Sequence, residues 1–532
     1  MVRVNAESWS AVDARTILDV LISAHESGPD EPALIYEDGV VVSRRDLFER
    51  VERFAGYLAC KVEPGDRVAI MLPNRTEYMI AWFAAAACRA TLVSINPAAK
   101  VHDAGHLVRD SDAKLAIIGE DGRSLFETIR SSCPSLKDVV VVEGSEPDGL
   151  DSVGSPGFSL VASAADAQRA DITNIYYTSG TTGLPKGCMV DHEYWLRFVD
   201  LFQRRYGMGP EDRFLCCLQF FYNDPPWQLL LSLHAGSPLV VMRTFSVRRY
   251  WDVVREHRVT IVFGIAATAY FLLGGEPSKD DRNTKVRLGV QVGIVANTHQ
   301  QLVERWGFPW VEGYGLTETG LIVSMPLDRA EEMVGSGSIG MPCGEVELRI
   351  VDHDDNDVAE GSIGQIIVRS PGMMRGYLNR PDETEATMRG GWLHTGDLGC
   401  IDDNGFVYFK GRQKDIIRRS GENVAAAEIE EVITVHPGVL EAAIVPVADD
   451  ARGEEIKAVI VPTDGTESEG DLFKEIVELC LQQLAKYKVP RYFEIRREPF
   501  ERTPSMRVKK DDLRNVLSEP PEMWDRESSM GW

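Results

Sequence analysis

The chain has 532 residues, of which 57 are Lys or Arg and 82 are Asp or Glu, so its formal net charge is −25. An apolar content of 44% is typical of a folded globular protein of several structural units and excludes a disordered or fibrous one. The negative overall field argues against a protein that coats nucleic acid or anionic lipid. An anionic ligand would therefore need a local binding site.

Targeting signals and cysteines give little sign of export. The amino terminus lacks the basic and apolar pattern of an export signal, and the longest apolar run, Tyr78 to Cys88, is too short to span a membrane. The nine cysteines include no CxxC pair, which predicts buried free thiols and no zinc cage. We expect a cytoplasmic protein without a membrane span.

Most of the chain alternates short β-branched runs with helical stretches. This rhythm predicts an α/β fold with largely parallel sheets covered by helices. Expected strands are residues 67–72, 114–119, 139–144, 238–242 and 260–265. Residues 151–171 are rich in Gly, Ser, Ala and Pro and suggest a surface linker, which leads into a strand at 174–177.

The pattern changes after about residue 414. The expected order is a helix, a pair of strands, a second helix and a last strand, at residues 427–436, 441–447, 455–462, 471–488 and 492–496. We therefore predict a large amino-terminal domain, residues 1–413, and a small α+β carboxy-terminal domain, residues 414–532.

A phosphate-binding loop is predicted directly after the strand that ends at Tyr177. The segment from Thr178 to Gly187 holds three glycines, four hydroxyl side chains and Lys186, which together can form a concave anion site. It is not a Walker A loop, because no Gly-Lys-Ser/Thr sequence follows at the required spacing. The alternative is a flexible surface loop. The expected phosphate-binding residues are Thr178, Ser179, Gly180, Thr181, Thr182, Gly183 and Lys186.

This loop resembles the signature loop of the adenylate-forming superfamily, which comprises acyl-CoA synthetases, adenylation domains and luciferases. Further segments resemble the other family motifs in the right order: residues 313–319, 391–397, 405–412, 420–423 and 428–430. Within the superfamily the chain most resembles the crotonobetaine/carnitine-CoA ligase group of acyl-CoA synthetases. The resemblance implies a large amino-terminal domain of several subdomains and a small, mobile carboxy-terminal domain.

The resemblance also assigns roles in nucleotide binding. It implies that the ring of Tyr314 stacks on adenine, that Thr317 contacts the α-phosphate and that Glu318 binds Mg²⁺, roles that suit these side chains. Asp397 and Arg412 would hold the ribose. Taken singly, Tyr314 is equally typical of a turn. The Thr317–Glu318 pair alone is more typical of a helix N-cap, and Asp397 with Arg412 is more typical of a surface ion pair.

The resemblance places a hinge at Lys414, after which Gly421 would reach the pantetheine tunnel of CoA. Rotation about this hinge would exchange the groups that surround one acyl-adenylate between two half-reactions.

The sequence departs from the family pattern at the catalytic lysine. The family has Ser-Gly-Lys where this chain has Ser505-Met-Arg507, and guanidinium is broader than ammonium. Because the positive charge remains, we expect Arg507 to serve adenylation together with Lys186, Thr317 and Glu318. Lys509 or Lys510 could substitute if the loop slips, and a solvated basic tail is the remaining alternative.

The second departure is in the expected acid pocket. Many relatives carry a histidine where this chain has Asn223, in a segment that also holds Tyr222, Asp224 and Trp227. These residues, with Gly315, are the predicted substrate pocket. Asp224 and the aromatic rings suit a cationic or amino-bearing acid. Alternatively, the rings belong to the core and Asp224 caps the helix that starts at Pro225, or Trp227 fills the pocket and restricts it to a small acid.

The leading functional prediction is ATP-dependent activation of a small or polar carboxylic acid as an acyl-adenylate, with transfer to the thiol of CoA and release of AMP. Positioning and charge neutralisation would carry the first step, so no nucleophilic Ser or Cys is needed. ATP, Mg²⁺ and CoA are the expected ligands. Two alternatives remain: CoA-independent adenylation of nitrite or another small acid with transfer to an amine, and a nucleotide-binding sensor with impaired catalysis.

Overall fold

The computed structural model describes residues 14–142, 150, 157–178, 185–294, 296–419, 422–449, 452–463, 469–502, 508–514 and 523–530. By their contacts, the described residues fall into two compact units, one from residues 1–348 and 368–393 and the other from residues 349–367 and 394–532. Residues 349–367 and 394–413 thus group with the second unit. The domain boundary predicted between residues 413 and 414 is the point about which the carboxy-terminal domain would rotate. This boundary stays a prediction.

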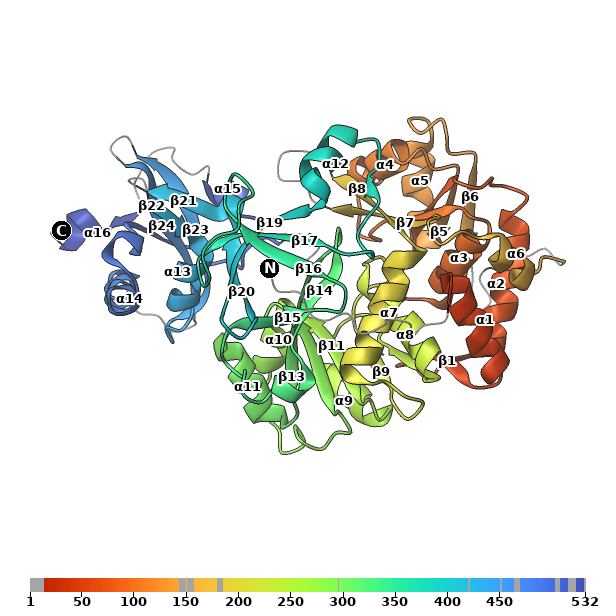
Figure 1. The fold of residues 1–532 in the computed structure, drawn as a ribbon, viewed down its shortest axis with the longest axis horizontal. Helices are drawn as coiled ribbons and strands as arrows, with labels where there is room; N and C mark the ends of the chain where they lie inside the picture. Colours follow the sequence, from red (N-terminus) through yellow and green to blue (C-terminus); the bar gives the residue numbers. More distant parts are fainter. Residues whose placement is uncertain are drawn as a thin grey trace. The chain divides into compact units, whose positions relative to one another are not determined.

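The first unit contains two sheets (Figure 1). The order of the seven-stranded sheet is β18-β8-β7-β4-β3-β5-β6. Its strands are β3 (Arg67–Met71), β4 (Thr91–Ser94), β5 (Leu115–Gly119), β6 (Asp138–Val142), β7 (Ile172–Thr178), β8 (Lys186–Asp191) and β18 (Gly376–Tyr377). The strands from β7 to β6 pair in parallel, whereas β8 and β18 pair antiparallel at one edge.

The other sheet of this unit includes the order β15-β14-β13-β12-β11-β9-β10-β1-β2. These strands are β1 (Pro32–Tyr36), β2 (Val41–Ser43), β9 (Phe214–Cys216), β10 (Leu239–Val241), β11 (Ile261–Ile265), β12 (Leu288–Val292), β13 (Trp310–Leu316), β14 (Gly320–Ser324) and β15 (Ser338–Pro342). The run from β1 to β13 is parallel, and β2, β14 and β15 are antiparallel. All six strands predicted before residue 270 are confirmed, and so is the largely parallel α/β class.

One layer of helices lies between these sheets. Helix α3 (Thr76–Ala87) contacts β4 and β7, α8 (Asp224–Ala235) contacts β9 and β10, and α1 (Ile17–Ser27) contacts both helices. Every residue of α3 is buried, which explains why this segment is apolar all round. Inside the layer, Trp82 Nε1 donates to Asn174 Oδ1 at 2.7 Å.

Outer helices cover the remaining faces. Helices α4 (Val101–Asp110) and α5 (Arg123–Arg130) pack on the seven-stranded sheet, while α9 (Val247–Glu256), α10 (Ala266–Leu273) and α11 (Ala296–Trp306) cover the other. The remaining helices are α2 (Arg44–Leu58), α6 (Leu160–Asp166), α7 (His192–Tyr206) and α12 (Pro381–Thr387). Helix α6 corrects the linker prediction for 151–171: its apolar side chains Leu160 and Ala164 are buried, which a surface linker would not allow.

The second unit is an α+β structure. Strands β16 (Glu347–Val351), β17 (Gly364–Arg369), β19 (Leu393–Ile401) and β20 (Val407–Arg412) are neighbours in that order. A further sheet holds β21 (Ile416–Arg419), β22 (Glu422–Ala425), β23 (Val439–Asp449), β24 (Gly453–Pro462), β25 (Tyr492–Ile495) and β26 (Trp524–Asp525). Helices α13 (Ala426–Ile433) and α14 (Glu469–Gln483) pack on it, and α15 (Asp511–Arg514) and α16 (Arg526–Met530) are short. The predicted element order is confirmed, although the second helix ends at Gln483 rather than at residue 488.

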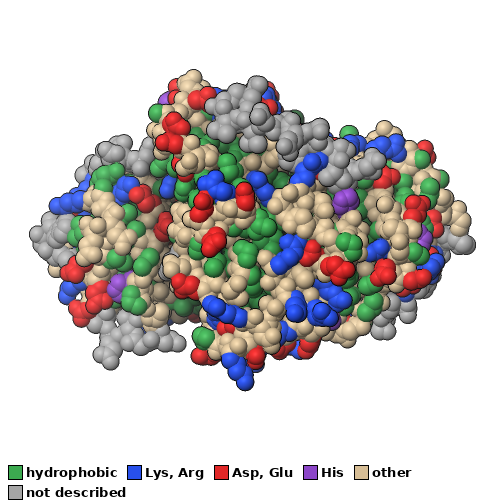
Figure 2. Space-filling view, turned by 60° about the horizontal axis from the view of Figure 1, so that its bottom comes forward, with side chains coloured by type: hydrophobic (Ala, Val, Ile, Leu, Met, Phe, Trp, Pro, Cys, Tyr) green, Lys and Arg blue, Asp and Glu red, His purple; other side chains and the backbone are tan. Residues whose placement is uncertain are grey.

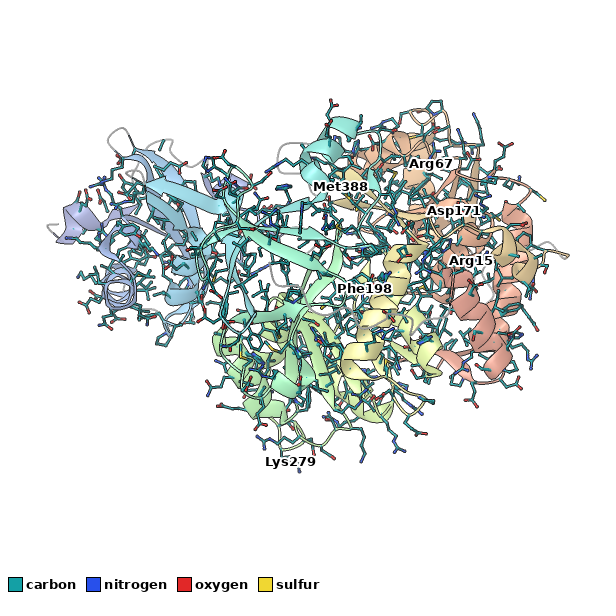
Figure 3. All side chains as sticks on the ribbon, in the orientation of Figure 1. Arg15, Arg67, Asp171, Phe198, Lys279 and Met388 are labelled. Atoms are coloured by element: carbon teal, nitrogen blue, oxygen red, sulfur yellow. The ribbon has the colours of Figure 1, made fainter. Side chains whose placement is uncertain are left out.

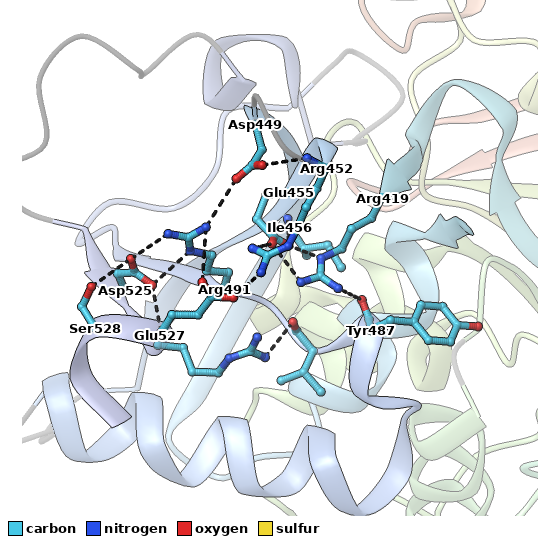
Figure 4. A network of polar contacts seen from close by, with 12 residues as sticks. Arg419, Asp449, Arg452, Glu455, Ile456, Tyr487, Arg491, Asp525, Glu527 and Ser528 are labelled. Atoms are coloured by element: carbon cyan, nitrogen blue, oxygen red, sulfur yellow. Dashed lines mark hydrogen bonds and ion pairs between the residues drawn. The ribbon is translucent and has the colours of Figure 1, made fainter. Parts of the chain in front are cut away.

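A network of ion pairs joins the last described residues to this sheet (Figure 4). The buried carboxylate of Glu455 accepts hydrogen bonds from Arg419 at 2.9 Å and Arg452 at 2.8 Å. Arg491 binds the carboxylate of Asp525 at 3.2 Å. Opposite charges are thus matched around Glu455, as a buried carboxylate requires. The network therefore holds β26 and α16 against the rest of the sheet.

The surface and the thiols bear on the remaining predictions. Figure 2 shows acidic and basic side chains interspersed over the face in view. No helix among the described ranges is long and apolar enough to cross a membrane. All nine cysteines are free thiols. Most are buried as predicted, but Cys60 is exposed and Cys88 and Cys400 are half-buried, so the expectation of uniformly buried thiols is wrong.

Candidate functional site

The two ends of the predicted phosphate loop lie side by side. Thr178 ends β7 and Lys186 begins β8, and the antiparallel register pairs these two residues directly. Residues 179–184 lie outside the described residues, so the roles of Ser179, Gly180, Thr181, Thr182 and Gly183 stay predictions.

Glu318 lies in the turn between β13 and β14 and contacts Thr178, the last residue of β7. Its Oε1 accepts a hydrogen bond from Thr178 Oγ1 at 3.4 Å and another from the hydroxyl of Tyr377 at 2.9 Å. Its Oε2 accepts none from the described residues. Thr317, which precedes it, is half-buried, and its carbonyl oxygen accepts from Cys188 Sγ at 3.6 Å. The structure thus brings together Thr178, Thr317 and Glu318 from two sheets.

The turn itself depends on two glycines. A Cβ at Gly315 would lie 2.1 Å from the carbonyl oxygen of Gly320, so no larger residue fits there. Gly320 has a φ of +65°, which favours glycine. These constraints fix the path of the backbone on both sides of Glu318. They also give Gly315 a structural reason in addition to its predicted place in the substrate pocket.

Tyr377 is a site residue that the sequence did not reveal. Strand β18 places it beside Cys188 of β8, and its hydroxyl reaches Glu318. Burial and the charge of Glu318 raise the pKa of Tyr377 well above its usual value. A phenol that stays protonated can donate to the carboxylate at all relevant pH values and hold it in one orientation. No motif that we recognised in the sequence includes this tyrosine.

Lys186 has a carboxylate partner that the sequence also did not reveal. Its ammonium forms an ion pair with Glu383 of α12 and lies 5.5 Å from the centre of the Tyr377 ring. The side chain of Lys186 keeps 23% of its surface exposed. An incoming phosphate would compete with Glu383 for this ammonium.

Tyr314 lies on β13, opposite Val323 of β14, and only 8% of its surface is exposed. Little of its ring is therefore open to a base in this structure, and adenine stacking stays a prediction.

The predicted acid pocket lies at the start of α8. Asn223 Nδ2 donates to the hydroxyl of Tyr194 at 3.1 Å. Trp227 is 1% exposed and stacks between Phe198, labelled in Figure 3, and Phe202 at centroid distances of 5.4 and 4.4 Å. Trp227 is therefore a core residue, which was one of the alternatives raised from the sequence. Tyr222, Asn223 and Asp224 remain partly exposed.

The two predicted ribose ligands lie together in the second unit. Asp397 and Arg412 are paired across β19 and β20, and Arg412 Nε lies 2.9 Å from Asp397 Oδ1. The Asp397 side chain is 2% exposed and that of Arg412 is 25% exposed. The pair is therefore an ion pair whose acidic partner is buried, and ribose binding by these residues stays a prediction.

The predicted hinge residue, Lys414, lies between two neighbours whose side chains make polar contacts. Gln413 accepts a hydrogen bond from Gln365 of β17 at 3.4 Å, and Asp415 pairs with Arg514 of α15 at 2.8 Å. Lys414 is the backbone step between these two attachments.

Arg507 and Gly421 lie outside the described residues. Of the two lysines proposed as substitutes for Arg507, Lys510 binds Glu430 of α13 at 2.6 Å and keeps only 15% of its side-chain surface exposed. Lys509 lies 3.7 Å from Glu501.

Two family models match most of the chain. The AMP-binding enzyme model matches residues 23–378, and the model of the AMP-binding enzyme C-terminal domain matches residues 428–507. The chain belongs to the AMP-binding enzyme family. The resemblance inferred from its motifs is thereby confirmed.

Individual AMP-binding enzymes are similar over nearly the whole length. A crotonobetaine/carnitine–CoA ligase of Escherichia coli O8 (strain IAI1) is 31% identical over 490 residues, which cover 88% of this chain and 92% of that protein. A long-chain-fatty-acid–CoA ligase of Escherichia coli O157:H7 is 29% identical over 523 residues, 91% of each chain. The crystal structure of ATP-bound MatB from Rhodopseudomonas palustris matches with a TM-score of 0.82 at 26% identity, covering 93% of this chain and 98% of that one.

In this AMP-binding enzyme, Tyr377→Phe should leave the carboxylate of Glu318 less firmly oriented, because the hydroxyl of Tyr377 donates to it. The variant removes one hydrogen bond to a charged group, which we expect to lower the rate of adenylate formation by roughly 3- to 30-fold at limiting Mg²⁺. Tyr57→Phe, at a half-buried tyrosine of α2 in the same unit, is the matched control. Pyrophosphate release measured across Mg²⁺ concentrations tests this, and equal rates in both variants would show that Tyr377 does not support the carboxylate.

Proposed function

We propose that this protein is an AMP-forming acid–CoA ligase that activates a small or polar carboxylic acid. The main support for the proposal is the contact of Glu318 with Thr178 and Tyr377. Through it, the predicted metal ligand, Glu318, lies next to Thr178, the first residue of the predicted phosphate loop. Family membership and the similar CoA ligases support ATP-dependent activation followed by transfer to CoA.

In the first half-reaction the acid carboxylate attacks the α-phosphorus of ATP and pyrophosphate leaves. Lys186 would release Glu383 and bind phosphate oxygens, while Thr178 and Thr317 donate their hydroxyl groups. Positioning and neutralisation of charge account for most of the rate enhancement in such transfers. In the second half-reaction a thiolate attacks the acyl carbon and AMP leaves.

Mg²⁺ fits the donor set at Glu318. The ion favours oxygen ligands and is held in nucleotide sites by one or two carboxylates together with phosphates and water. Glu318 supplies one such carboxylate and keeps Oε2 available, while Tyr377 and Thr178 hold Oε1. When bound, the ion would neutralise charge on the leaving pyrophosphate.

A pyrophosphate-release screen over carboxylic acids and nitrite, each with and without CoA, tests the proposal. An acid ligase releases pyrophosphate with particular acids and consumes CoA in turn. Pyrophosphate release without CoA consumption in any condition would favour transfer to an amine instead. Failure of every acid to trigger release would leave a nucleotide-binding sensor.

Rotation about Lys414 gives a further prediction. Lys414→Pro restricts φ to about −65° and biases the preceding residue, so the two attachments on either side should be trapped in one arrangement. If the adenylating arrangement is trapped, we expect a burst of pyrophosphate and then little thioester. If the other is trapped, thiolation of a pre-made adenylate survives and adenylation fails.

Lys414→Ala is the control, because it removes the side chain but leaves the backbone free. We expect this variant to retain both half-reactions. Steady thioester synthesis by Lys414→Pro at the rate of Lys414→Ala would refute the hinge assignment.

A further inference from the structure

The carboxylate of Asp224 does not cap its own helix. Asp224 is the first residue of α8, and the capping position belongs to Asn223, which makes no side-chain capping hydrogen bond. Pro225 and Pro226 follow, and proline has no N–H for a carboxylate to accept. The helix-cap alternative raised from the sequence is therefore not what the structure shows.

Asp224 also has no cationic partner among the residues that the structure describes. Its one hydrogen bond there comes from Trp227 Nε1 at 3.5 Å, which is long. The described groups whose pKa its charge raises come from β7, α7, β9 and the adjoining loops, and all are neutral at pH 7. They are Tyr176, Tyr194, Tyr222, Cys216 and Cys217. A carboxylate in such surroundings is an unbalanced negative charge.

The start of α8 offers acceptor oxygens rather than an enclosure of aromatic rings. Asp224 remains partly exposed, as does Tyr222 beside it. In contrast, the rings of Trp227, Tyr176 and Tyr194 are only 1%, 5% and 0% exposed, so they cannot enclose a ligand. A carboxylate has about four lone-pair sites, which N–H groups can fill and methyl groups cannot. The geometry thus favours a cation that carries N–H bonds over a quaternary ammonium.

Tyr194 lies between the start of α8 and the Glu318 turn. Asn223, the residue before Asp224, donates from its Nδ2 to the hydroxyl of Tyr194 at 3.1 Å, so Tyr194 lies beside the start of α8. Its ring would also lie 3.5 Å from a Cβ placed on Gly320, at the end of the Glu318 turn. A bound acid could therefore direct its carboxylate toward the Glu318 turn and its other end toward Asp224.

We propose that Asp224 binds the protonated amino group of the substrate, so that the enzyme activates amino-bearing carboxylic acids in preference to their uncharged analogues. This inference rests on the proposed ligase function and names the substrate class of the same site. Asp224 acts in binding, since the amino group lies at the end of the substrate remote from the reacting carboxylate.

The pH dependence has a defined sign. Burial raises the pKa of Asp224 to about 6, with the Trp227 N–H opposing the shift, while an aliphatic ammonium stays protonated throughout this range. Below pH 6 Asp224 loses its charge. The KM for an amino acid substrate should therefore rise as pH falls from 7 to 5, and the KM of an uncharged analogue should not share that rise.

Acid-dependent ATP–pyrophosphate exchange by the full-length protein tests the proposal. The amino acids are β-alanine, γ-aminobutyrate and meta-(aminomethyl)benzoate, all of which carry an aliphatic ammonium, and their methyl isosteres are butanoate, pentanoate and meta-ethylbenzoate. The trimethylammonium derivative of γ-aminobutyrate completes the panel. We expect the preferred amino acid to exceed its isostere in kcat/KM by roughly 10- to 100-fold, as one charge-assisted hydrogen-bonded contact provides. We also expect it to exceed the trimethylammonium acid.

The variant Asp224→Asn keeps the shape and removes the charge. It should reduce the preference for the amino acid over its isostere by roughly 10- to 100-fold and abolish the difference in pH dependence. Asp328→Asn, an exposed aspartate of the same unit, is the control for the loss of one negative charge. Thermal unfolding of both variants checks that they fold, and Asp224→Glu should recover part of the preference.

The outcomes separate the two claims. Exchange with isosteres or the trimethylammonium acid in preference to amino acids overturns the amino-group assignment and leaves the ligase function standing. An unchanged amino acid preference in folded Asp224→Asn overturns it as well. If Asp224→Asn does not fold, the wild-type preference and pH profile decide. No exchange with any acid would reject the proposed function itself.

Discussion

Replacing Arg507 with alanine is expected to slow acyl-adenylate formation by roughly 30- to 1000-fold. The reason is the loss of a positive charge that offsets charge at the reacting phosphate, an effect of about 2 to 4 kcal/mol when a single donor is removed from an oxyanion site. Thiolation of a pre-made adenylate should survive, because that half-reaction would use the other orientation of the carboxy-terminal domain. Single-turnover pyrophosphate release and thioester formation measure the two steps separately.

Lys510→Ala is the discriminating comparison for this prediction. The structure pairs Lys510 with Glu430 at 2.6 Å, so this lysine already has a structural role and we expect its removal to leave adenylation within a few-fold of wild type. Arg507→Lys should restore much of the rate, since ammonium supplies the same charge. A large loss in Lys510→Ala or Lys509→Ala, with none in Arg507→Ala, would instead support the slipped-loop alternative.

Glu318→Gln is expected to lower Mg²⁺-dependent adenylation by about 100-fold or more while ATP binding changes far less. The substitution replaces a charged oxygen ligand with a neutral amide, which Mg²⁺ binds poorly, and the hydrogen bonds from Tyr377 and Thr178 would then go to an uncharged acceptor. We therefore expect the Mg²⁺ concentration for half-maximal pyrophosphate exchange to rise. Nucleotide binding, followed by equilibrium dialysis without metal, should be nearly retained.

The control is Glu331→Gln, which neutralises an exposed glutamate of the same unit. It should show the Mg²⁺ response of the wild type. A wild-type Mg²⁺ response in Glu318→Gln would exclude this carboxylate as the metal ligand.

The sequence alone determined the class of the fold and the order of its chemical segments. Alternation of β-branched runs with helical stretches depends on neighbours within a few residues, so strands such as β5 and β11 were predicted close to their observed bounds. The phosphate loop and the Thr317-Glu318 segment are likewise contiguous. Their residue types and order were therefore readable without a structure.

The prediction of a surface linker is wrong because tertiary contacts, which the local composition does not record, stabilise a helix there. The composition of residues 151–171 is that of a loop, yet Leu160 and Ala164 become buried and stabilise α6. Local propensity in a short helix is weak compared with the burial of apolar side chains in tertiary contacts.

Only the tertiary structure decided which distant residues share the site. Tyr377 follows Thr178 by about two hundred positions and reaches Glu318 only because β18 pairs with β8 at the edge of the seven-stranded sheet. The same is true of Glu383 beside Lys186 and of Trp227, whose ring is removed from the pocket by stacking against α7. Sheet order and side-chain packing arise from long-range contacts that no local pattern records, whereas strand type, turn chemistry and motif order arise from local ones.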